Sequence, residues 1–110
     1  MAVIKPLEMN FQEDKPSREL LYEDTNAKVI RFYLKKGQEI KPHKSPSSVF
    51  IWVLKGKGLF SLPDGEETLL EEGSSVFYAP MELHGFKALE DLIVQAVIAP
   101  NPTASKLKLS

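Results

Sequence analysis

The segment GQEIKPHKSPSSVFIWVLKGKG, residues 37–58, decides which fold class we expect for this chain. Its second half carries the unbroken apolar run 49–54, rich in β-branched and aromatic residues, which is typical of a buried strand. Gly56 and Gly58 follow this run directly and indicate a tight turn into another strand. The first half contains His43, one of only two histidines in the chain. The segment therefore predicts a strand and a turn close to a histidine.

The rest of the chain continues in short apolar or alternating blocks, without helical periodicity. Pro63-Asp64-Gly65 lies between two such blocks and indicates a hairpin. The expected strands are 19–23, 28–34, 49–54, 58–62, 68–71, 75–78, 84–88 and 92–98. Many short strands with tight turns predict an all-β sandwich or barrel, because closure removes unpaired sheet edges in a short chain.

The length of 110 residues fits one domain with one hydrophobic core. We expect an N-terminal arm and first strand in residues 1–27, a barrel in residues 28–98, and a flexible C-terminal tail in residues 99–110. The chain has no cysteine, which excludes disulfides, thiolate metal sites and a cysteine nucleophile.

The charge pattern restricts the class of partner. A formal net charge of −1 argues against nucleic acid, because phosphate neutralisation needs a concentrated basic surface. Residues 31–57 nevertheless hold seven Lys and Arg against Glu39 alone, whereas residues 58–95 hold eight Asp and Glu against Lys87. These segments form either two solvated faces or a basic rim that attracts an anionic small molecule.

The sequence shows no secretion signal at its N-terminus and no stretch that is long and apolar enough to span a membrane. We therefore expect a cytoplasmic protein without a membrane partner.

Two stretches resemble the paired motifs of the cupin superfamily. In residues 37–58, Gly37, His43 and Gly56 match the first motif, and in GSSVFYAPMELHGFKA, residues 73–88, Gly73 and His84 match the second. The resemblance implies a double-stranded β-helix, or jelly-roll barrel. It also implies one metal, held by His, His and Glu or Gln from the first motif and by His from the second.

The chain departs from that pattern at half of the implied metal ligands. Ser45 stands at the second histidine position and Val49 at the carboxylate or amide position, so only His43 and His84 remain. Valine makes the interior drier and removes negative charge that a divalent cation needs. We expect either a weakly held Zn, Fe, Mn, Ni or Cu ion on the two histidines, or no metal and imidazoles that act as hydrogen-bonding groups.

Two acidic residues are weaker candidates for completing a metal site. Glu82 lies two residues before His84, and Glu39 lies four before His43, so each shares a face with its histidine in an extended chain. The residues expected to line the pocket are Ser45, Val49, Ile51, Tyr78 and Phe86.

Three functions are compatible with this pattern. The leading interpretation is a single-domain cupin that binds a small polar or anionic molecule in its barrel. A metal-dependent oxygenase or isomerase would use the same histidines, with catalytic residues unassigned. A non-catalytic scaffold is favoured if Phe86, Tyr78 and Met81 fill the barrel interior.

The strand 49–54 also has an outward side. Phe50, Trp52 and Leu54 alternate with the residues expected to face the interior. This apolar face and the resemblance together predict a homodimer that buries Trp52 and the N-terminal arm. The alternative is coverage within one chain by residues 1–18.

Overall fold

The computed structural model describes residues 1–5 and 8–103, and within them it contains nine strands and no helix. The strands are β1 (Ser17–Glu23), β2 (Lys28–Leu34), β3 (Glu39–His43), β4 (Ser48–Lys55), β5 (Lys57–Ser61), β6 (Glu67–Glu71), β7 (Ser75–Tyr78), β8 (His84–Ala88) and β9 (Leu92–Ala99). All eight strands expected from the sequence are present, and the all-β prediction is confirmed. The described part thus has no helix that could cross a membrane.

β3 is the strand that the sequence patterns did not predict. Four of its five residues are exposed, and it contains Pro42, which cannot donate a backbone hydrogen bond. Proline is tolerated at a sheet edge, and β3 is an edge strand that pairs only with β8. The pairing is held by backbone groups, which hydrophobic alternation does not reveal.

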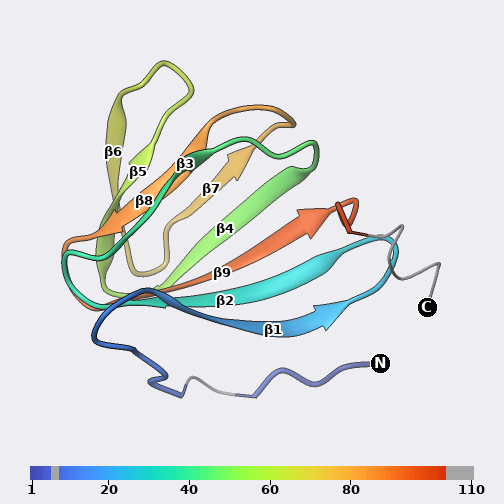
Figure 1. Cartoon of the computed structure of the whole chain (residues 1–110), viewed down its shortest axis with the longest axis horizontal. Coiled ribbons are helices and arrows are strands. Elements are labelled where there is room, and N and C mark those ends of the chain that lie inside the picture. The colour runs from blue at the N-terminus through green and yellow to red at the C-terminus, as the bar shows by residue number, and fades with distance from the viewer. Residues whose placement is uncertain (6–7, 104–110) are drawn as a thin grey trace.

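The strands pair in antiparallel fashion in two sheets. Sheet A has the order β1-β2-β9-β4-β7 and sheet B the order β3-β8-β5-β6. In Figure 1 sheet A forms the lower and right-hand part of the molecule, and sheet B the left-hand part. The chain changes sheet six times, at β2–β3, β3–β4, β4–β5, β6–β7, β7–β8 and β8–β9, as in a jelly-roll barrel.

The hydrophobic core lies between the two sheets. β4 shows how the sequence builds it, because Val49, Ile51 and Val53 are 2–3% exposed and the alternate residues point outward. The other buried members of the core are Ile30, Phe32, Leu34, Phe60, Tyr78, Phe86, Ala88, Leu92, Val94 and Ala96. No buried side-chain nitrogen or oxygen of the described residues lacks a hydrogen-bond partner.

The turn between β4 and β5 requires glycine at position 56. Gly56 has a φ of +80°, a conformation that other residues rarely adopt, and a Cβ there would collide with the backbone oxygen of Asp91. The β4–β5 turn therefore packs closely against the turn that leads into β9.

Both ends of the described chain are attached to sheet A. Phe11, in the N-terminal arm, packs edge-on against Tyr33 of β2, with ring centroids 5.9 Å apart. Asn101 follows β9, is only 4% exposed and donates to the backbone oxygen of Asp24 at 2.9 Å. Within the segment expected to be a flexible tail, the side chain of Asn101 is thus buried, and its amide bridges the chain after β9 to the β1–β2 turn. Residues 104–110 of that segment lie outside the described residues.

Candidate functional site

His43 and His84, which are 41 positions apart in the sequence, lie directly opposite each other in the structure. His43 ends β3 and His84 begins β8, and the two are register partners across the antiparallel pair. Their ring centroids are 4.1 Å apart, with an angle of 56° between the ring planes. His84 is 6% exposed, whereas His43 is exposed. The pair therefore lies at the boundary of the barrel, with His84 on the interior side and His43 on the solvent side.

The close approach of β3 and β8 depends on the residue after His84. Gly85 has no side chain, and a Cβ at this position would lie 2.6 Å from the nitrogen of Pro42 and 2.7 Å from the oxygen of Ile40. A register irregularity between Ile40 and His43 then sets His43 opposite His84. The backbone geometry of both strands thus places the two rings together.

Each histidine ring is oriented by its own backbone. His43 Nδ1 lies 3.1 Å from the oxygen of Lys41, and His84 Nδ1 lies 3.2 Å from the oxygen of Glu82. A carbonyl oxygen only accepts hydrogen bonds, so Nδ1 carries the proton in both rings. In the neutral form of each ring, Nε2 then carries the lone pair. This arrangement, with one ring nitrogen held by a carbonyl and the other free, is usual for histidines that bind metal.

The surroundings of His84 favour its neutral form. Burial lowers the pKa of His84 below its ordinary value of 6.5, and the neighbouring His43 lowers it further. The hydrogen bond to the oxygen of Glu82 opposes this shift. When both imidazoles are neutral, their Nε2 lone pairs can accept hydrogen bonds or bind a cation.

The structure does not bring a third metal ligand to this pair. Glu82 Oε1 accepts a hydrogen bond from the backbone nitrogen of Ala79 at 2.7 Å, so this carboxylate closes the β7–β8 loop. Glu39 is paired in register with Lys87. Within residues 1–5 and 8–103, no three His, Cys, Asp or Glu side chains are grouped so that they could hold a metal ion. His43 and His84 therefore fit two of the metal-ligand positions that the cupin resemblance implies. In the described residues, no side chain supplies a ligand at the other positions.

Ser45 and Val49, which stand at the other implied ligand positions, have structural contacts of their own. The hydroxyl oxygen of Ser45 accepts from the backbone nitrogen of Ser47 at 3.1 Å, and its carbonyl oxygen accepts from the nitrogen of Met81 at 2.7 Å. Val49 is 3% exposed and opposite Tyr78 in sheet A. Ser45 thus ties the β3–β4 loop to the β7–β8 loop, and Val49 belongs to the core.

The remaining residues expected to line a pocket fill the interior instead. The hydroxyl of Tyr78 donates to the oxygen of Ser61 at 2.7 Å, and its ring centroid lies 5.3 Å from that of His84. Burial raises the pKa of this phenol. Phe86 is stacked on Phe60 with centroids 5.1 Å apart, and Ile51 is 2% exposed. The space beneath the histidine pair is therefore occupied by packed side chains.

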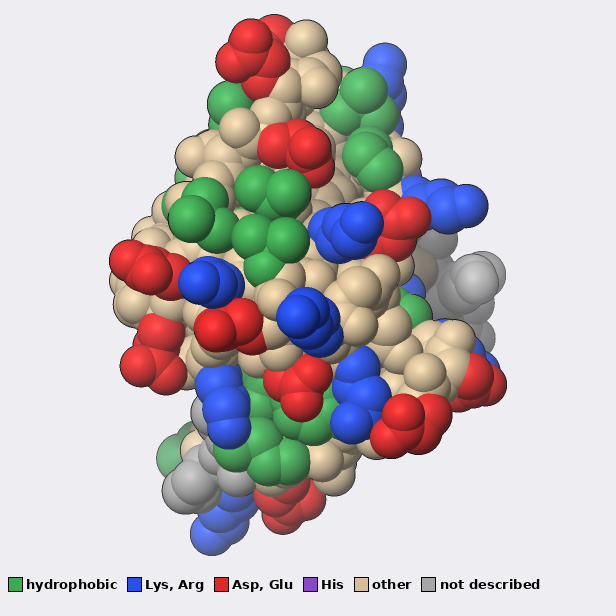
Figure 2. Space-filling model, turned by 90° about the vertical axis from the view of Figure 1, so that its left-hand side faces the viewer, with side chains coloured by type: hydrophobic (Ala, Val, Ile, Leu, Met, Phe, Trp, Pro, Cys, Tyr) green, Lys and Arg blue, Asp and Glu red, His purple; other side chains and the backbone are tan. Residues whose placement is uncertain are grey.

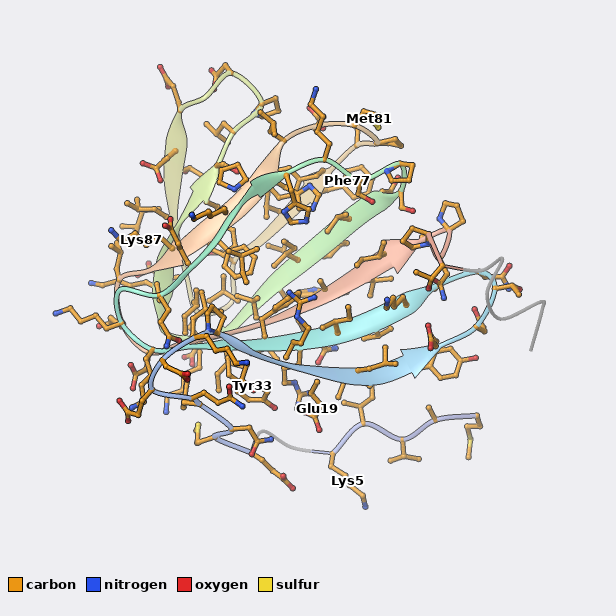
Figure 3. The ribbon with its side chains drawn as sticks, in the orientation of Figure 1. Lys5, Glu19, Tyr33, Phe77, Met81 and Lys87 are labelled. Atoms are coloured by element: carbon orange, nitrogen blue, oxygen red, sulfur yellow. The ribbon has the colours of Figure 1, made fainter. Side chains whose placement is uncertain are left out.

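Met81 differs from this group. It is 57% exposed and has a φ of +69°, which is uncommon for a residue with a side chain. It lies in the loop between β7 and β8, which Figure 3 shows at the top of the molecule. Met81 therefore does not help to fill the interior, although Phe86 and Tyr78 do.

The basic segment of residues 31–57 does not form one cationic surface. Arg31 is 6% exposed, and its Nη2 donates to Gln95 at 2.9 Å. Lys55 and Lys57 line an open groove together with Glu71, Glu72, Glu90 and Asp91. Only Lys41 and Lys44, both exposed, flank His43 in the sequence. The face in Figure 2 shows basic and acidic side chains interspersed, with neither histidine visible.

Sequence reasoning missed the features that orient the site. The strand β3, the bonds from each Nδ1 to a carbonyl two residues earlier, and the loop-closing role of Glu82 all depend on the folded backbone. One signal was available: a proline and lysines in a short polar stretch are typical of an edge strand.

Comparisons with known proteins agree with this geometry. The family model described as "Cupin domain" matches residues 30–99. An RmlC-like cupin protein from Desulfovibrio desulfuricans has 26% identity and a TM-score of 0.77, with 89% of this chain and 92% of that chain covered. A Klebsiella pneumoniae protein with a double-stranded β-helix domain has 26% identity and a TM-score of 0.79, with 86% and 85% covered.

A further structural neighbour has an enzyme name. The polyketide cyclase RemF from Streptomyces resistomycificus has 17% identity and a TM-score of 0.71, with 90% of this chain and 81% of that chain covered. At this identity the likeness shows the fold alone. No curated protein matches the chain. The specific activity must therefore be argued from the site.

Proposed function

The chain belongs to the family of cupin domains, and from this premise we propose that it binds a small polar or anionic molecule at His43 and His84, together with a weakly held divalent transition metal. The observation that carries the proposal is the pair of adjacent rings whose Nδ1 atoms lie against backbone carbonyls, which leaves both Nε2 atoms to face a ligand. Two free imidazole nitrogens on adjacent strands are suited to Zn, Fe, Mn, Ni or Cu.

When bound, the metal would supply a Lewis acid with coordination positions open to water or ligand. The contribution of the chain is to hold the rings in place. β3 and β8 fix the distance between the rings, and the carbonyls of Lys41 and Glu82 fix the proton on each Nδ1. Tyr78 and the aromatic core close the inner side of the site. A ligand therefore approaches from the side of the exposed His43.

Two features support a polar or anionic ligand. The exposed lysines Lys41 and Lys44 precede and follow His43, and they provide positive charge at the solvent side. Tyr78 and Phe86 leave the interior packed, so an apolar molecule has no preformed space beneath the rings. The ligand class proposed is thus a small molecule with oxygen donors, such as a carboxylate or a hydroxy acid.

A metal titration tests this proposal. Thermal unfolding of metal-stripped protein would be followed with Zn²⁺, Ni²⁺ or Mn²⁺, for the wild type, His43→Ala, His84→Ala and Lys87→Ala. Lys87 is the matched control, because it is exposed and lies on β8 near His84. When the free metal concentration is about 100 times the dissociation constant, a metal that binds only the folded state raises the free energy of unfolding by about 2.7 kcal/mol.

We expect a metal-induced rise in melting temperature in the wild type and Lys87→Ala, and none in either histidine variant. Small carboxylates and hydroxy acids would then be added with the metal, to give a further rise that also needs both histidines. A wild type that does not respond to any of the metals, or a response that survives both His→Ala changes, would contradict the metal site.

A non-catalytic scaffold is the second candidate, and the filled interior favours it. Phe86 contacts both Phe60 and Phe32 with ring centroids 5.1 and 5.8 Å away, and Tyr78 is 2% exposed. On this hypothesis the histidines are satisfied by their carbonyl bonds alone. Neither metal nor small carboxylate would then stabilise the wild type, and that result distinguishes the two candidates.

A further inference from the structure

Arg18, near the start of β1, lies on the inner face of sheet A. It is the register partner of Phe32 on β2, which belongs to the hydrophobic core. Register partners share one face of a sheet, so Arg18 and Phe32 are on the same side. The guanidinium carbon of Arg18 lies 5.2 Å from the centre of the Phe32 ring. A permanently charged group therefore lies over an aromatic ring of the core.

The guanidinium of Arg18 has no acidic partner among the described residues. The one ion pair there joins Lys35 to Glu13. Arg18 is exposed, so its N–H donors are accessible to solvent. Arginine presents these donors as a planar fork that fits a carboxylate at two points. Arg18 is thus available to a carboxylate from solution.

Arg18 also lines an open hollow of about 400 Å³ beside the start of β1. The hollow is lined by Gln12, Lys15, Pro16, Ser17 and Arg18. Lys15 and Arg18 are its charged members, and both are basic. By contrast, the groove at Lys55 and the hollow at Arg31 each contain acidic residues as well. The surroundings of Arg18 therefore favour an anion.

Two aromatic rings connect Arg18 to the histidine pair. Phe32, under Arg18, contacts Phe86 with ring centroids 5.8 Å apart. Phe86 lies two residues after His84 on β8, so their side chains share one face and are about 7 Å apart along the strand. Arg18 and His84 thus flank the same two rings from different sheets. β1 and β3 are both edge strands, so no further strand pairs beyond Arg18 or His43 (Figure 1).

We propose that Arg18 is a second anchor for the ligand of the histidine pair, and that this ligand carries two acidic groups. The inference rests on the proposed function, because one group binds at His43 and His84. The guanidinium of Arg18, with the ammonium of Lys15 nearby in the hollow, binds the other.

The position of the two rings sets the minimum length of such a ligand. Phe32 is 9% exposed and Phe86 is 5% exposed, so the ligand passes over these rings on the solvent side. Its acidic groups are then separated by at least roughly 7 Å, the distance that two residues of a strand span. The ligand class is therefore an elongated dicarboxylate, and a compact dicarboxylate such as malonate is too short.

Calorimetric titration of the full chain tests this inference, in the presence of the metal that stabilises the wild type. The probes are pimelate, an elongated linear dicarboxylate, and heptanoate, which has the same carbon chain and one carboxylate. The wild type should bind pimelate at least about tenfold more tightly than heptanoate, because the second carboxylate gains charge-assisted hydrogen bonds. Malonate should show no such advantage.

Arg18→Met should bind pimelate and heptanoate equally, because it keeps an unbranched side chain over Phe32 and loses the charge. Arg18→Lys should keep part of the preference, since it retains the charge without the fork. Lys36→Met is the matched control, because Lys36 is exposed in the β2–β3 turn and its loss changes the net charge equally. It should keep the full preference for pimelate.

The metal response separates this inference from the proposed function. Arg18→Met should keep the metal-induced rise in melting temperature, whereas His43→Ala should lose both that rise and the preference for pimelate. A preference that is absent from the wild type, or that survives Arg18→Met or His43→Ala, would overturn the second anchor and leave a histidine-dependent metal response standing. A wild type without that metal response would overturn the proposed function, and the second anchor with it.

Discussion

His43 and His84 are register partners with ring centroids 4.1 Å apart, yet only His84 is buried. The two rings thus lie side by side but differ in their relation to the core. His84 also contacts Tyr78 at 5.3 Å between centroids. The contribution of each ring to stability and its contribution to binding can therefore be separated by experiment.

The first prediction concerns the stability of the two alanine variants. In the presence of a chelator, His84→Ala should lower the free energy of unfolding by about 1–3 kcal/mol, because a buried ring is lost from the core. His43→Ala should change it by less than about 0.5 kcal/mol, because that ring is exposed. Urea denaturation measures both. Equal losses would show that the two rings are not packed as differently as the structure indicates.

A second prediction uses the glycine between the two strands. Gly85→Ala should abolish the metal response although both histidines remain, because its Cβ would push Pro42 and Ile40 of β3 away from β8. The metal titration described above measures the effect. Gly65→Ala is the control, since it also introduces a Cβ but nothing lies within 4 Å of it. Its φ of +89° still makes alanine unfavourable there, so stability should fall without loss of the metal response. A Gly85→Ala protein that binds metal like the wild type would show that the spacing of β3 and β8 is not what positions the rings.

The third prediction is a dependence of stability on alkaline pH. Burial raises the pKa of Tyr33 above its ordinary value of 10.0, and the hydrogen bond to Glu19 raises it further, against an opposing effect of Arg31. The unfolded chain therefore releases this proton at lower pH than the folded chain does. Stability from Tyr33 is fully present below pH 10 and is lost as the pH rises through the pKa of the folded state.

Tyr33→Phe provides the comparison for this effect. Its free energy of unfolding should decline less steeply above pH 10 than that of the wild type. Ultraviolet titration of the folded proteins should show that the phenol missing from the variant ionises above 10. A phenol that titrates at its ordinary value would contradict the burial of Tyr33.

The fourth prediction tests the packed interior. Phe86→Ala should lower the free energy of unfolding by about 3–5 kcal/mol, because Phe86 is 5% exposed and contacts two other aromatic rings. Urea denaturation measures this loss, and Leu69→Ala, at an exposed position, should change stability by about 0.5 kcal/mol or less. A small loss at Phe86 would mean that the space beneath the histidines is open to a ligand.

Much of the fold was predictable because burial and strand pairing follow local pattern. In β4 the residues Val49, Ile51 and Val53 point inward, and alternation alone assigned them to one face. β3 was not predictable in this way, since its mostly exposed residues do not alternate between apolar and polar. It exists because its backbone groups complete the edge of β8.

The candidate site was predictable only in part. Resemblance at the level of residue spacing suggested His43 and His84, and the fold brings them together. The sequence could not show that the carboxylate of Glu82 turns toward the backbone of Ala79, because this depends on a loop in which Met81 has a positive φ. Nor could the sequence show that Tyr78 and Phe86 fill the interior, since this depends on how the two sheets pack and not on either sequence motif.

The last prediction concerns the segment after β9. The amide of Asn101 donates to Glu23 at 3.2 Å and to the oxygen of Asp24 at 2.9 Å, and its oxygen accepts from the backbone nitrogen and the hydroxyl of Thr103 at 2.9 and 2.8 Å. Asn101→Ala leaves these groups without partners in a half-buried place, which should lower the free energy of unfolding by about 1–3 kcal/mol. Urea denaturation measures this loss.

Asn26→Ala is the matched control for Asn101, since Asn26 is exposed in the β1–β2 turn that Asn101 contacts, and its change should be about 0.5 kcal/mol or less. Asn101→Asp should be at least as harmful as alanine, because it removes the donor and places a carboxylate beside Glu23. Limited proteolysis should cleave after β9 faster in both Asn101 variants than in the wild type. If both variants unfold and cleave like Asn26→Ala, then the segment after β9 adds nothing to the stability of the barrel, and its buried amide is not an anchor.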